Sequence, residues 1–322
     1  MKIVCAAGIA CLALTCAAAA SAHSYPARPI RLIVPQAPGS ASDTIARIVA
    51  LELGQQFNQQ IVVDNRPGGA LTIGMELTAK ATPDGYTLGY APVGALAISP
   101  NLVRKLSYDV LKDFQPIAQI ASNQMLLAAA PAAPVTSVRE VIDYAKQNPG
   151  RLLNASSGNG TPGQVGFELF KLMTGTQIVH VPYKGGAAGI ADLIAGQVHL
   201  MMESLNSITL HARAGRVRAL GVSGAKRSAA LPDTPTIAEA GVPGYEATTW
   251  NGIVAPAGTP EPIVAKLNAE LNKALASPAL RQRFAGIGAD PVGGTPGAFA
   301  ALIRTEHAKW GDVIRRSGAR ID

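Results

Sequence analysis

The chain has 322 residues, of which 48% are hydrophobic, 15% are charged and 5% are aromatic. This length and mixture exclude an intrinsically disordered chain, a coiled coil and a domain too small to bury its own core. The formal net charge is +7, from 28 Lys and Arg against 21 Asp and Glu, but the basic residues are scattered and few aromatic side chains could stack on bases, so we expect small anions and no nucleic acid as partners.

The N-terminal segment is typical of an export signal. Lys2 supplies a positive start, residues 3–20 form an apolar run rich in Ala, and residues 20–22 read Ala-Ser-Ala, so we predict a signal peptide over residues 1–22 that is cleaved after Ala22. The alternative is a membrane anchor, but a small-residue cleavage site favours the signal. All three cysteines lie inside this segment, at Cys5, Cys11 and Cys16. We therefore expect a soluble periplasmic protein with no disulfide, thiolate metal site or cysteine nucleophile.

Strand and helix patterns alternate after the signal. The run Ile30–Val34 is rich in β-branched residues and is followed by Pro35, and the small residues after it lead into an apolar helical pattern over 45–53 that we expect to stop at Gly54. The other elements expected in this part are strands at 61–63 and 86–91, a helix ending near residue 80, and two strands back to back at 115–121 and 125–130.

The second half of the chain shows helix-start signals between further strands. Ser137-x-x-Glu140 is a capping-box signature, and Thr161-Pro162-x-Gln164 places a cap, a first-turn proline and a box partner together. The expected helices are 137–147, 161–174, 186–195, 205–214, 259–276 and 295–316, and the expected strands are 152–155, 178–181, 198–202, 217–222 and 249–255. Strands separated by helices of this length predict an α/β fold built from βαβ units, with mostly parallel sheets.

Two places indicate crossings between domains. One is the pair of back-to-back strands near 115–130, and the other is the Pro/Gly-containing stretch at 243–249. We therefore predict a discontinuous first domain over residues 23–123 and 250–322, with a second domain inserted at 124–249.

Two loops have the composition of ligand-binding loops. Residues 35–43 and residues 156–162 each connect a strand to a helix and are rich in Gly, Ser and Ala. Small residues let backbone N–H groups approach a ligand, and a helix N-terminus adds partial positive charge, which suits a carboxylate or phosphate. Ligands in open α/β sheets bind beyond the carboxyl ends of strands, so the two loops could face each other across an interdomain cleft. The alternative for each loop is an ordinary capped turn.

Other motifs are absent or weak. Gly158-x-Gly160-x-x-Gly163 matches a dinucleotide fingerprint, but Pro162 lies inside it and no acidic residue ends the next strand near His180. Neither a Walker A sequence nor a Gly-x-Ser-x-Gly elbow occurs, and no histidine has a ligand-spaced partner, so we expect no cofactor, no metal and no catalytic residue. Glu203 ends an apolar strand, where it could meet a ligand's ammonium or hydroxyl or be a satisfied structural carboxylate.

A series of motifs from Tyr25 to Pro260 resembles the Bug family, the periplasmic solute receptors of tripartite tricarboxylate transporters. The motifs are Tyr25-Pro26-x-Arg28-Pro29-Ile30, Pro38-Gly39-x-x-x-Asp43, Val63-x-Asn65-Arg66-Pro67-Gly68, Pro83-Asp84-Gly85-Tyr86-Thr87-Leu88, Ser157-x-Gly-x-Gly160-Thr161, Val181-Pro182-Tyr183-Lys184-Gly185, Gly196-Gln197-Val198, Leu231-Pro232-Asp233-Thr234-Pro235-Thr236, and Trp250-x-Gly252 with Ala255-Pro256-x-Gly258-Thr259-Pro260. Each motif is weak alone, but their order and spacing are specific.

The resemblance implies a type II-like periplasmic binding protein, a Venus flytrap of two α/β lobes that close on a small organic acid in the cleft between them. The acids expected are mono- or dicarboxylates, with amino acids and aromatic acids among the candidates. It implies a monomer that serves membrane transporter subunits, and loops that hold a carboxylate largely through backbone N–H groups and water. The ligand-binding residues expected from the loops and the resemblance are Ala37, Gly39, Ser40, Ala41, Ser42, Asp43, Pro92, Val93, Gly94, Ser156, Gly158, Gly160, Thr161, Lys184, Gly185, Gly186 and Glu203. The chain departs from the family's common residues at Ser40, Gln164 and Glu203, so the far end of the ligand is the least transferable part.

Three functions follow as hypotheses. The first is a periplasmic receptor for a carboxylate, and the second is an orphan ligand sensor that uses the same cleft. The third is a secreted α/β hydrolase, with Ser40, Ser42 or Ser156 as nucleophile together with Asp43, and with His180 or His199 as base.

Overall fold

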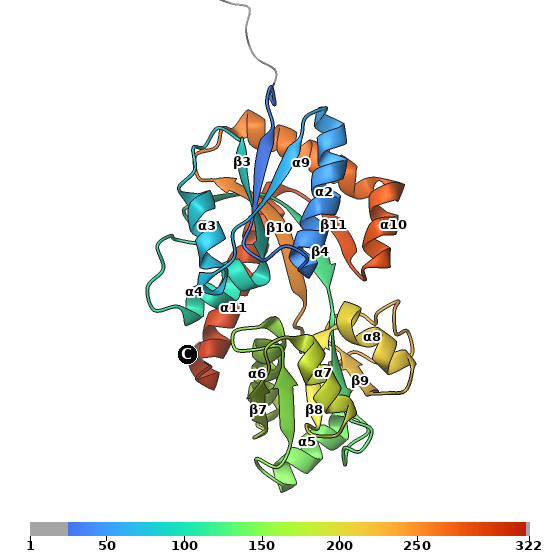
Figure 1. Cartoon of the computed structure of the whole chain (residues 1–322). Helices are drawn as coiled ribbons and strands as arrows, with labels where there is room; N and C mark the ends of the chain where they lie inside the picture. The colour runs from blue at the N-terminus through green and yellow to red at the C-terminus, as the bar shows by residue number, and fades with distance from the viewer. Residues whose placement is uncertain (1–24, 320–322) are drawn as a thin grey trace, which may run out of the picture.

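The computed structural model describes residues 25–319, so the predicted signal peptide lies outside the described residues. The chain forms two lobes, each built on one β-sheet with helices packed against it (Figure 1). The strand order is β11-β4-β10-β3-β1-β2 in the six-stranded sheet and β7-β6-β8-β5-β9 in the five-stranded sheet. Within the described residues, no helix is both long and apolar enough to cross a membrane.

The first lobe holds the six-stranded sheet. Its strands are β1 (Ile30–Val34), β2 (Ile61–Asn65), β3 (Thr87–Pro92), β4 (Phe114–Asn123), β10 (Thr249–Pro256) and β11 (Asp290–Gly293). Its helices are α2 (Ala41–Phe57), the 3-10 turn η1 (Gly69–Leu71), α3 (Thr72–Ala79), the π-helical turn η2 (Gly94–Ile98), α4 (Ser99–Leu102), α9 (Glu261–Ala276), α10 (Pro278–Gly286) and α11 (Pro296–Ser317).

The second lobe holds the five-stranded sheet. Its strands are β5 (Met125–Ala129), β6 (Leu153–Ser156), β7 (Val179–Pro182), β8 (Leu200–Ser204) and β9 (Arg218–Val222), and its helices are α5 (Val138–Gln147), α6 (Pro162–Thr174), α7 (Gly186–Ile194) and α8 (Leu205–Arg213). The expected helices α5 and α6 begin at their predicted caps, because the side chains of Ser137 and Thr161 accept from the N–H groups three residues later.

The expectation of mostly parallel sheets is wrong, because both sheets are mixed. The pairs of β1 with β2 and β3, and of β6 with β7 and β8, are parallel. Strands β10 and β11 run the other way in the first sheet, since β10 is antiparallel to β3 and β4, and β11 is antiparallel to β4. In the second sheet β5 is antiparallel to β8 and β9.

Helix α2 does not end at Gly54 as expected. It continues to Phe57 and ends at Asn58, which has the left-handed backbone conformation that closes many helices. Gly54 is instead a packing position, because a Cβ added there would lie 3.1 Å from the carbonyl oxygen of Gln59. Its small size lets the helix lie close to the chain that enters β2.

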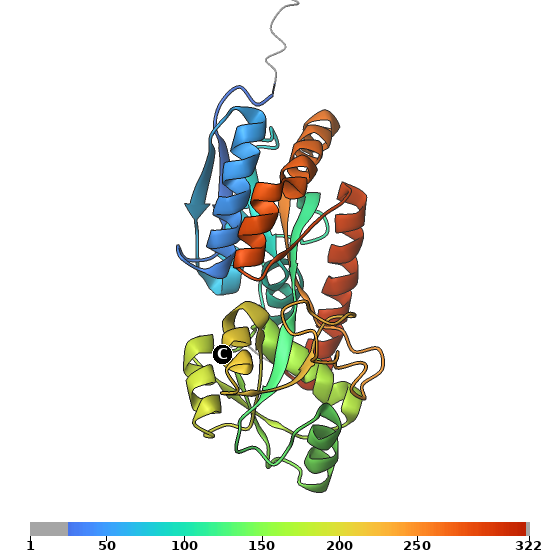
Figure 2. The ribbon, with the colours of Figure 1, turned by 90° about the vertical axis from the view of Figure 1, so that its right-hand side faces the viewer.

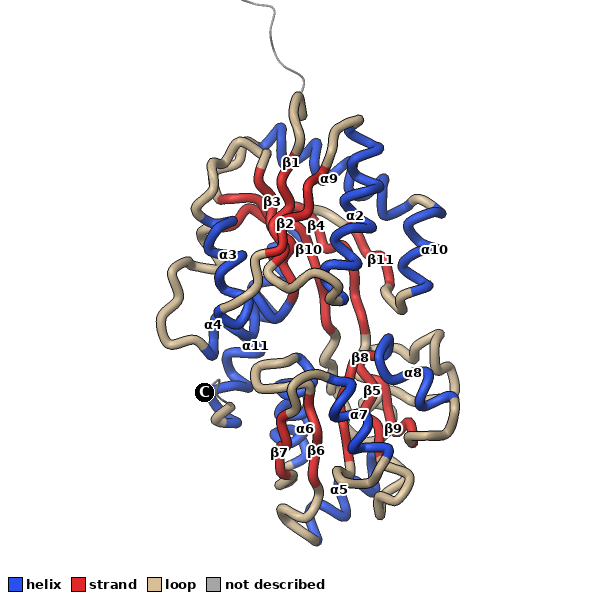
Figure 3. Tube along the Cα trace, in the orientation of Figure 1, coloured by secondary structure: helices blue, strands red, loops and turns tan. Residues whose placement is uncertain are grey.

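Two strands and one helix connect the lobes. Strand β4 leads through Gln124 into β5, and β10 returns from the second lobe to the first, as Figure 3 shows. Helix α11 starts on the first lobe and runs toward the second, where it packs on α6 (Figure 2). Trp310, Val313 and Ile314 of its C-terminal half belong to the same buried cluster as Phe167 and Phe170 of α6. The predicted domain boundaries at 123/124 and 249/250 stay a prediction.

Candidate functional site

A cavity of about 650 Å³ lies between the two lobes. Both lobes contribute to it: the start of α2 and the end of β3 come from the first, and the loop after β6, the start of α7 and the end of β8 come from the second. The lining residues are Gln36, Ser40, Ala41, Ser42, Ile45, Leu71, Pro92, Val93, Gly94, Asn123, Met125, Ser157, Thr161, Pro162, Gly163, Gly185, Gly186, Glu203, Ser204, Asn206, Ser207, Thr249, Trp250 and Asn251.

Helix N-termini supply the positive potential of this cleft. Helices α2, α6, α7 and α8 begin at Ala41, Pro162, Gly186 and Leu205, each of which is a lining residue or directly follows one. The first N–H groups of a helix have no acceptor within it and carry a partial positive charge, so they can donate to an anion. Among the described residues that line the cleft there is no Lys, Arg or His, and Glu203 is the one charged side chain. A carboxylate bound here would be held by backbone amides and hydroxyls.

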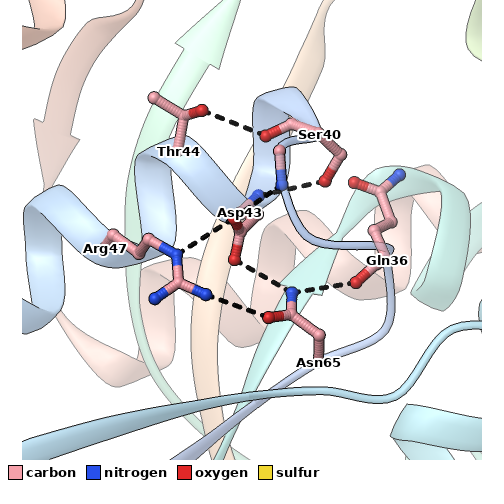
Figure 4. Close-up of polar contacts among 7 residues, drawn as sticks. Gln36, Ser40, Asp43, Thr44, Arg47 and Asn65 are labelled. Atoms are coloured by element: carbon pink, nitrogen blue, oxygen red, sulfur yellow. Dashed lines mark hydrogen bonds and ion pairs between the residues drawn. The ribbon is translucent and has the colours of Figure 1, made fainter.

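The first-lobe loop is shaped by the carboxylate of Asp43 (Figure 4). Asp43 is 3% exposed, and its Oδ2 accepts from the backbone N–H of Gly39 at 2.8 Å and from Arg47 Nε at 3.0 Å. Its Oδ1 accepts from Asn65 Nδ2 at 2.9 Å, and the same amide donates to the carbonyl oxygen of Gln36 at 3.0 Å. Asp43 thus ties both ends of the loop to the end of β2.

These contacts also set the charge state of Asp43. Burial alone would raise its pKa, but the hydrogen bonds from Arg47, Gly39 and Asn65 outweigh burial and hold the pKa below its usual range. Asp43 is not among the described residues that line the cavity, and its carboxylate holds the loop. Ser40 caps α2 by accepting from the N–H of Asp43 at 3.2 Å, which leaves the start of the helix open to the cleft.

The second-lobe loop is shaped by a chain of side-chain hydrogen bonds. Gln164 Oε1 accepts from the N–H of Gly160 at 2.5 Å, so its Nε2 is the atom that faces His180 Nδ1, at 3.3 Å. An amide NH₂ is a donor, which makes His180 Nδ1 the acceptor and places the ring proton on Nε2. That nitrogen lies 2.6 Å from Ser156 Oγ, and the hydroxyl of Ser156 donates in turn to the carbonyl oxygen of Gly158 at 3.1 Å.

The charge state of His180 and the position of Ser156 both follow from burial. Burial, and secondly the positive charge of Lys171, lower the pKa of His180 below its usual value. Ser156 is fully buried and accepts from the ring rather than giving it a proton. His199, the other base considered for a hydrolase, accepts from the N–H of Leu153 at 3.0 Å through Nδ1.

Glu203 lies at the carboxyl end of β8 and is 9% exposed. Its Oε2 accepts from the hydroxyl of Ser157, and its Oε1 accepts from the N–H of Ser204 at 2.8 Å. A Cβ added at Gly186 would lie 2.8 Å from Glu203 Oε2, so the glycine lets the first turn of α7 approach the carboxylate. The side chain therefore joins the loop after β6 to the starts of α7 and α8.

The structure brings part of the expected site together. Ten of the expected residues line the cavity: Ser40, Ala41, Ser42, Pro92, Val93, Gly94, Thr161, Gly185, Gly186 and Glu203. Seven do not, namely Ala37, Gly39, Asp43, Ser156, Gly158, Gly160 and Lys184. The amides of Gly39 and Gly160 already donate to Asp43 and Gln164, so those two shape the loops. Ligand contact stays a prediction for every residue of the set.

Sequence reasoning missed the residues that the crossing strands contribute. Asn123 of β4 and Trp250 and Asn251 of β10 line the cavity between the lobes. Asn123 is 7% exposed, and within residues 25–319 its Oδ1 has no hydrogen-bond partner. A buried polar atom without a partner is costly, so a donor that reached Asn123 Oδ1 would be stabilising. The available signal was an asparagine between two β-type runs, which is weak because β4 also contains Gln115, Gln119 and Ser122.

The described part of the chain holds no group of three or more His, Cys, Asp or Glu side chains placed to bind a metal ion.

Comparison with known proteins gives one consistent result. The sequence model of the family described as "tripartite tricarboxylate transporter family receptor" matches residues 45–319 of this chain. The chain is 37% identical over 306 residues to protein BugT of Bordetella pertussis, which covers 95% of this chain and 94% of BugT.

Solved structures agree with this result. The structure of R. palustris Rpa4515 with adipate is 40% identical, covers 92% of this chain and 100% of that chain, and has a TM-score of 0.79. The structure of MatC from Rhodopseudomonas palustris with bound malate is 32% identical, covers 90% of this chain and 100% of that chain, and has a TM-score of 0.75.

Proposed function

This chain belongs to the tripartite tricarboxylate transporter receptor family, and we propose that it is a periplasmic receptor that captures a small carboxylate-bearing organic acid and delivers it to membrane transporter subunits. The observation that carries the proposal is the cleft between the lobes, where helix N-termini from both lobes surround a cavity whose described lining holds no cationic side chain. The backbone N–H groups at these helix N-termini suit a carboxylate.

Adipate and malate, bound by the two similar proteins, are small acids with more than one carboxylate. The cavity of about 650 Å³ has room for an acid of this size. We therefore place the ligand among small organic acids and assign its carboxylate to the starts of α2 and α6, near Ala41 and Gly163, since Pro162 has no N–H to donate.

Capture would work through lobe closure. A carboxylate that accepts from amides of both lobes binds the closed form better than the open form, and this difference in affinity shifts the population toward closure. We propose that residues 23–123 with 250–322 and residues 124–249 are the two moving units of a monomer. The crossing strands β4 and β10 are the hinge between them.

A binding role also fits the Ser156–His180 pair better than catalysis. A catalytic serine gives its proton to the histidine, whereas here the histidine nitrogen that faces Ser156 carries the ring proton. Ser156 is also fully buried. We therefore propose that the protein is not an enzyme.

The proposal is tested by thermal melting of the mature protein against mono- and dicarboxylates of two to eight carbons, with the matching primary amides as controls. A ligand at a hundred times its dissociation constant adds about 2.7 kcal/mol to the free energy of unfolding. We expect stabilisation by at least one acid and none by its amide. If no organic acid raises the melting temperature, the receptor proposal is wrong.

Delivery to a transporter needs its own test. Uptake of the identified acid, radiolabelled, is measured in cells with and without this receptor. Loss of uptake supports transport, and unchanged uptake together with tight binding favours the orphan sensor.

A further inference from the structure

The position of Glu203 raises the question of what it recognises. It is the one charged side chain among the described residues that line the cleft, in a site proposed for an anion. A carboxylate has about four lone-pair positions, and Ser157 and Ser204 use two of those on Glu203. The carboxylate of Glu203 can therefore accept further hydrogen bonds from a molecule in the cavity.

Two of the helix N-termini already face this carboxylate. The start of α7 lies against Glu203 at Gly186, and α8 begins at Leu205, two residues beyond Glu203. Their partial positive charges are therefore directed at a side chain of the protein. The starts of α2, on the opposite lobe, and of α6 are left for the carboxylate of a ligand.

A second acceptor in the same cavity points the same way. Asn123 Oδ1 is buried and without a partner among the described residues, and it comes from β4 rather than from the elements that hold Glu203. An occupant that satisfies it must donate a hydrogen bond. A second carboxylate cannot donate, and it would also meet the like charge of Glu203.

On the basis of the proposed function, we propose that the ligand carries, besides its carboxylate, a hydroxyl or ammonium group that donates to Glu203. Glu203 is then a specificity-determining residue that favours hydroxy or amino acids over acids with a second, ionised carboxylate at that end.

The test uses sets of acids of one length that differ only at the far end. Adipate, 6-hydroxyhexanoate and 6-aminohexanoate form one set, and succinate, 4-hydroxybutanoate and 4-aminobutanoate form another. Binding to the mature protein is measured by titration calorimetry at pH 7.5. In the set that fits the cavity, we expect at least one donor-bearing acid to bind at least tenfold more tightly than the dicarboxylate. A preference for the amino acid assigns a cation to the far end, and a preference for the hydroxy acid assigns a neutral donor.

The variant Glu203→Gln removes the charge while keeping the shape of the side chain. We expect it to tighten binding of the dicarboxylate at least tenfold and to weaken binding of the amino acid by a similar factor. The matched control is Glu246→Gln, an exposed residue outside the lining of the cleft, which should leave the ranking unchanged.

Two results overturn the inference. One is a wild-type protein that binds the dicarboxylate as tightly as both donor-bearing acids, which leaves the proposed function intact. The other is an unchanged ranking in folded Glu203→Gln. If the variant does not fold, the wild-type ranking decides alone. If no acid of any length binds, the proposed function fails as well.

Discussion

The Asp43 network leads to a prediction that joins stability to ligand binding. In Asp43→Asn the side chain keeps one oxygen and gains an amide nitrogen. If the oxygen stays with Gly39 and Arg47, the new NH₂ faces the donor Nδ2 of Asn65, and that hydrogen bond is lost. The loop would then be tied to the end of β2 only through the hydrogen bond from Asn65 to the carbonyl oxygen of Gln36.

The size of the effect follows from these contacts. A hydrogen bond to a charged group contributes about 1.5–3 kcal/mol when it is buried. The pair with Arg47, whose side chain is 53% exposed, adds less than about 1 kcal/mol. We expect Asp43→Asn to lower the free energy of unfolding by about 2–3 kcal/mol. A loop that holds its binding shape only a tenth of the time would also weaken the apparent affinity about tenfold.

Urea denaturation and titration with the identified acid measure the two effects. The control is Asp312→Asn, whose exposed pairs with Arg315 and Arg316 should contribute less than about 1 kcal/mol. The folded-state pKa of Asp43 is below its usual range. Its contribution to the free energy of unfolding is therefore fully present above the unfolded-state pKa and is lost as the pH falls through the folded-state pKa. The difference in free energy of unfolding between wild type and Asp43→Asn should therefore become smaller at acidic pH. A variant within about 0.5 kcal/mol of wild type at pH 7, with unchanged affinity, would refute the role given to Asp43.

Three further predictions concern the second lobe and the hinge. Gly163→Ala places a Cβ 2.3 Å from the carbonyl oxygen of Met202, so it should push the start of α6 away from β8. We expect urea denaturation to show a free energy of unfolding lower by more than about 2 kcal/mol. A smaller loss together with normal ligand affinity would contradict this packing. His180 has a folded pKa below its unfolded value, so the unfolded chain binds more protons between the two, and stability should fall as the pH drops below about 6.5. Urea midpoints from pH 7.5 to pH 5 should show a smaller fall in His180→Asn, and parallel curves would count against the assignment. Glu306 accepts hydrogen bonds from the indole N–H groups of Trp250, at 3.3 Å, and Trp310, at 2.8 Å. Glu306→Ala should therefore lower the free energy of unfolding by about 2–4 kcal/mol and change the tryptophan fluorescence. An unaltered emission spectrum would disagree with this contact.

Local chemistry explains which parts of the fold could be predicted. Ile30–Val34 matches β1 at both ends, because a β-branched run is bounded by Pro35 and the strand is buried on both faces. Helix α10 (Pro278–Gly286) was missed because it is short and only Leu280 and Phe284 of it are buried. The four-residue strand β11 was missed because it forms only by pairing with β4. Sheet direction was also beyond local patterns, since it depends on how the chain crosses between the lobes.

The same distinction applies to the candidate site. Loops such as 156–161 could be recognised because their Gly and Ser content and the cap at Thr161 are local signals. Which loop residues shape the loops and which line the cavity could not be predicted. This depends on the hydrogen bonds of Asp43 with Asn65 and of Gln164 with His180, and tertiary structure places these partners. Asn123 and Trp250 reach the cleft only because β4 and β10 cross at its base, so their spacing in the sequence carries no sign of the site.

The lack of a cationic side chain in the described lining of the cleft bears on how fast and under what conditions a ligand is taken up. Helix dipoles act over one turn, whereas a guanidinium attracts an anion across about a Debye length, roughly 10 Å at 0.1 M salt. No cation in the described lining then steers the ligand into the cleft, and the ligand is attracted only by the net positive charge of the whole chain. Ligand uptake should accordingly depend less on the ionic strength of the surroundings than uptake by a cleft lined with Arg or Lys, which matters for a receptor proposed to work in the periplasm.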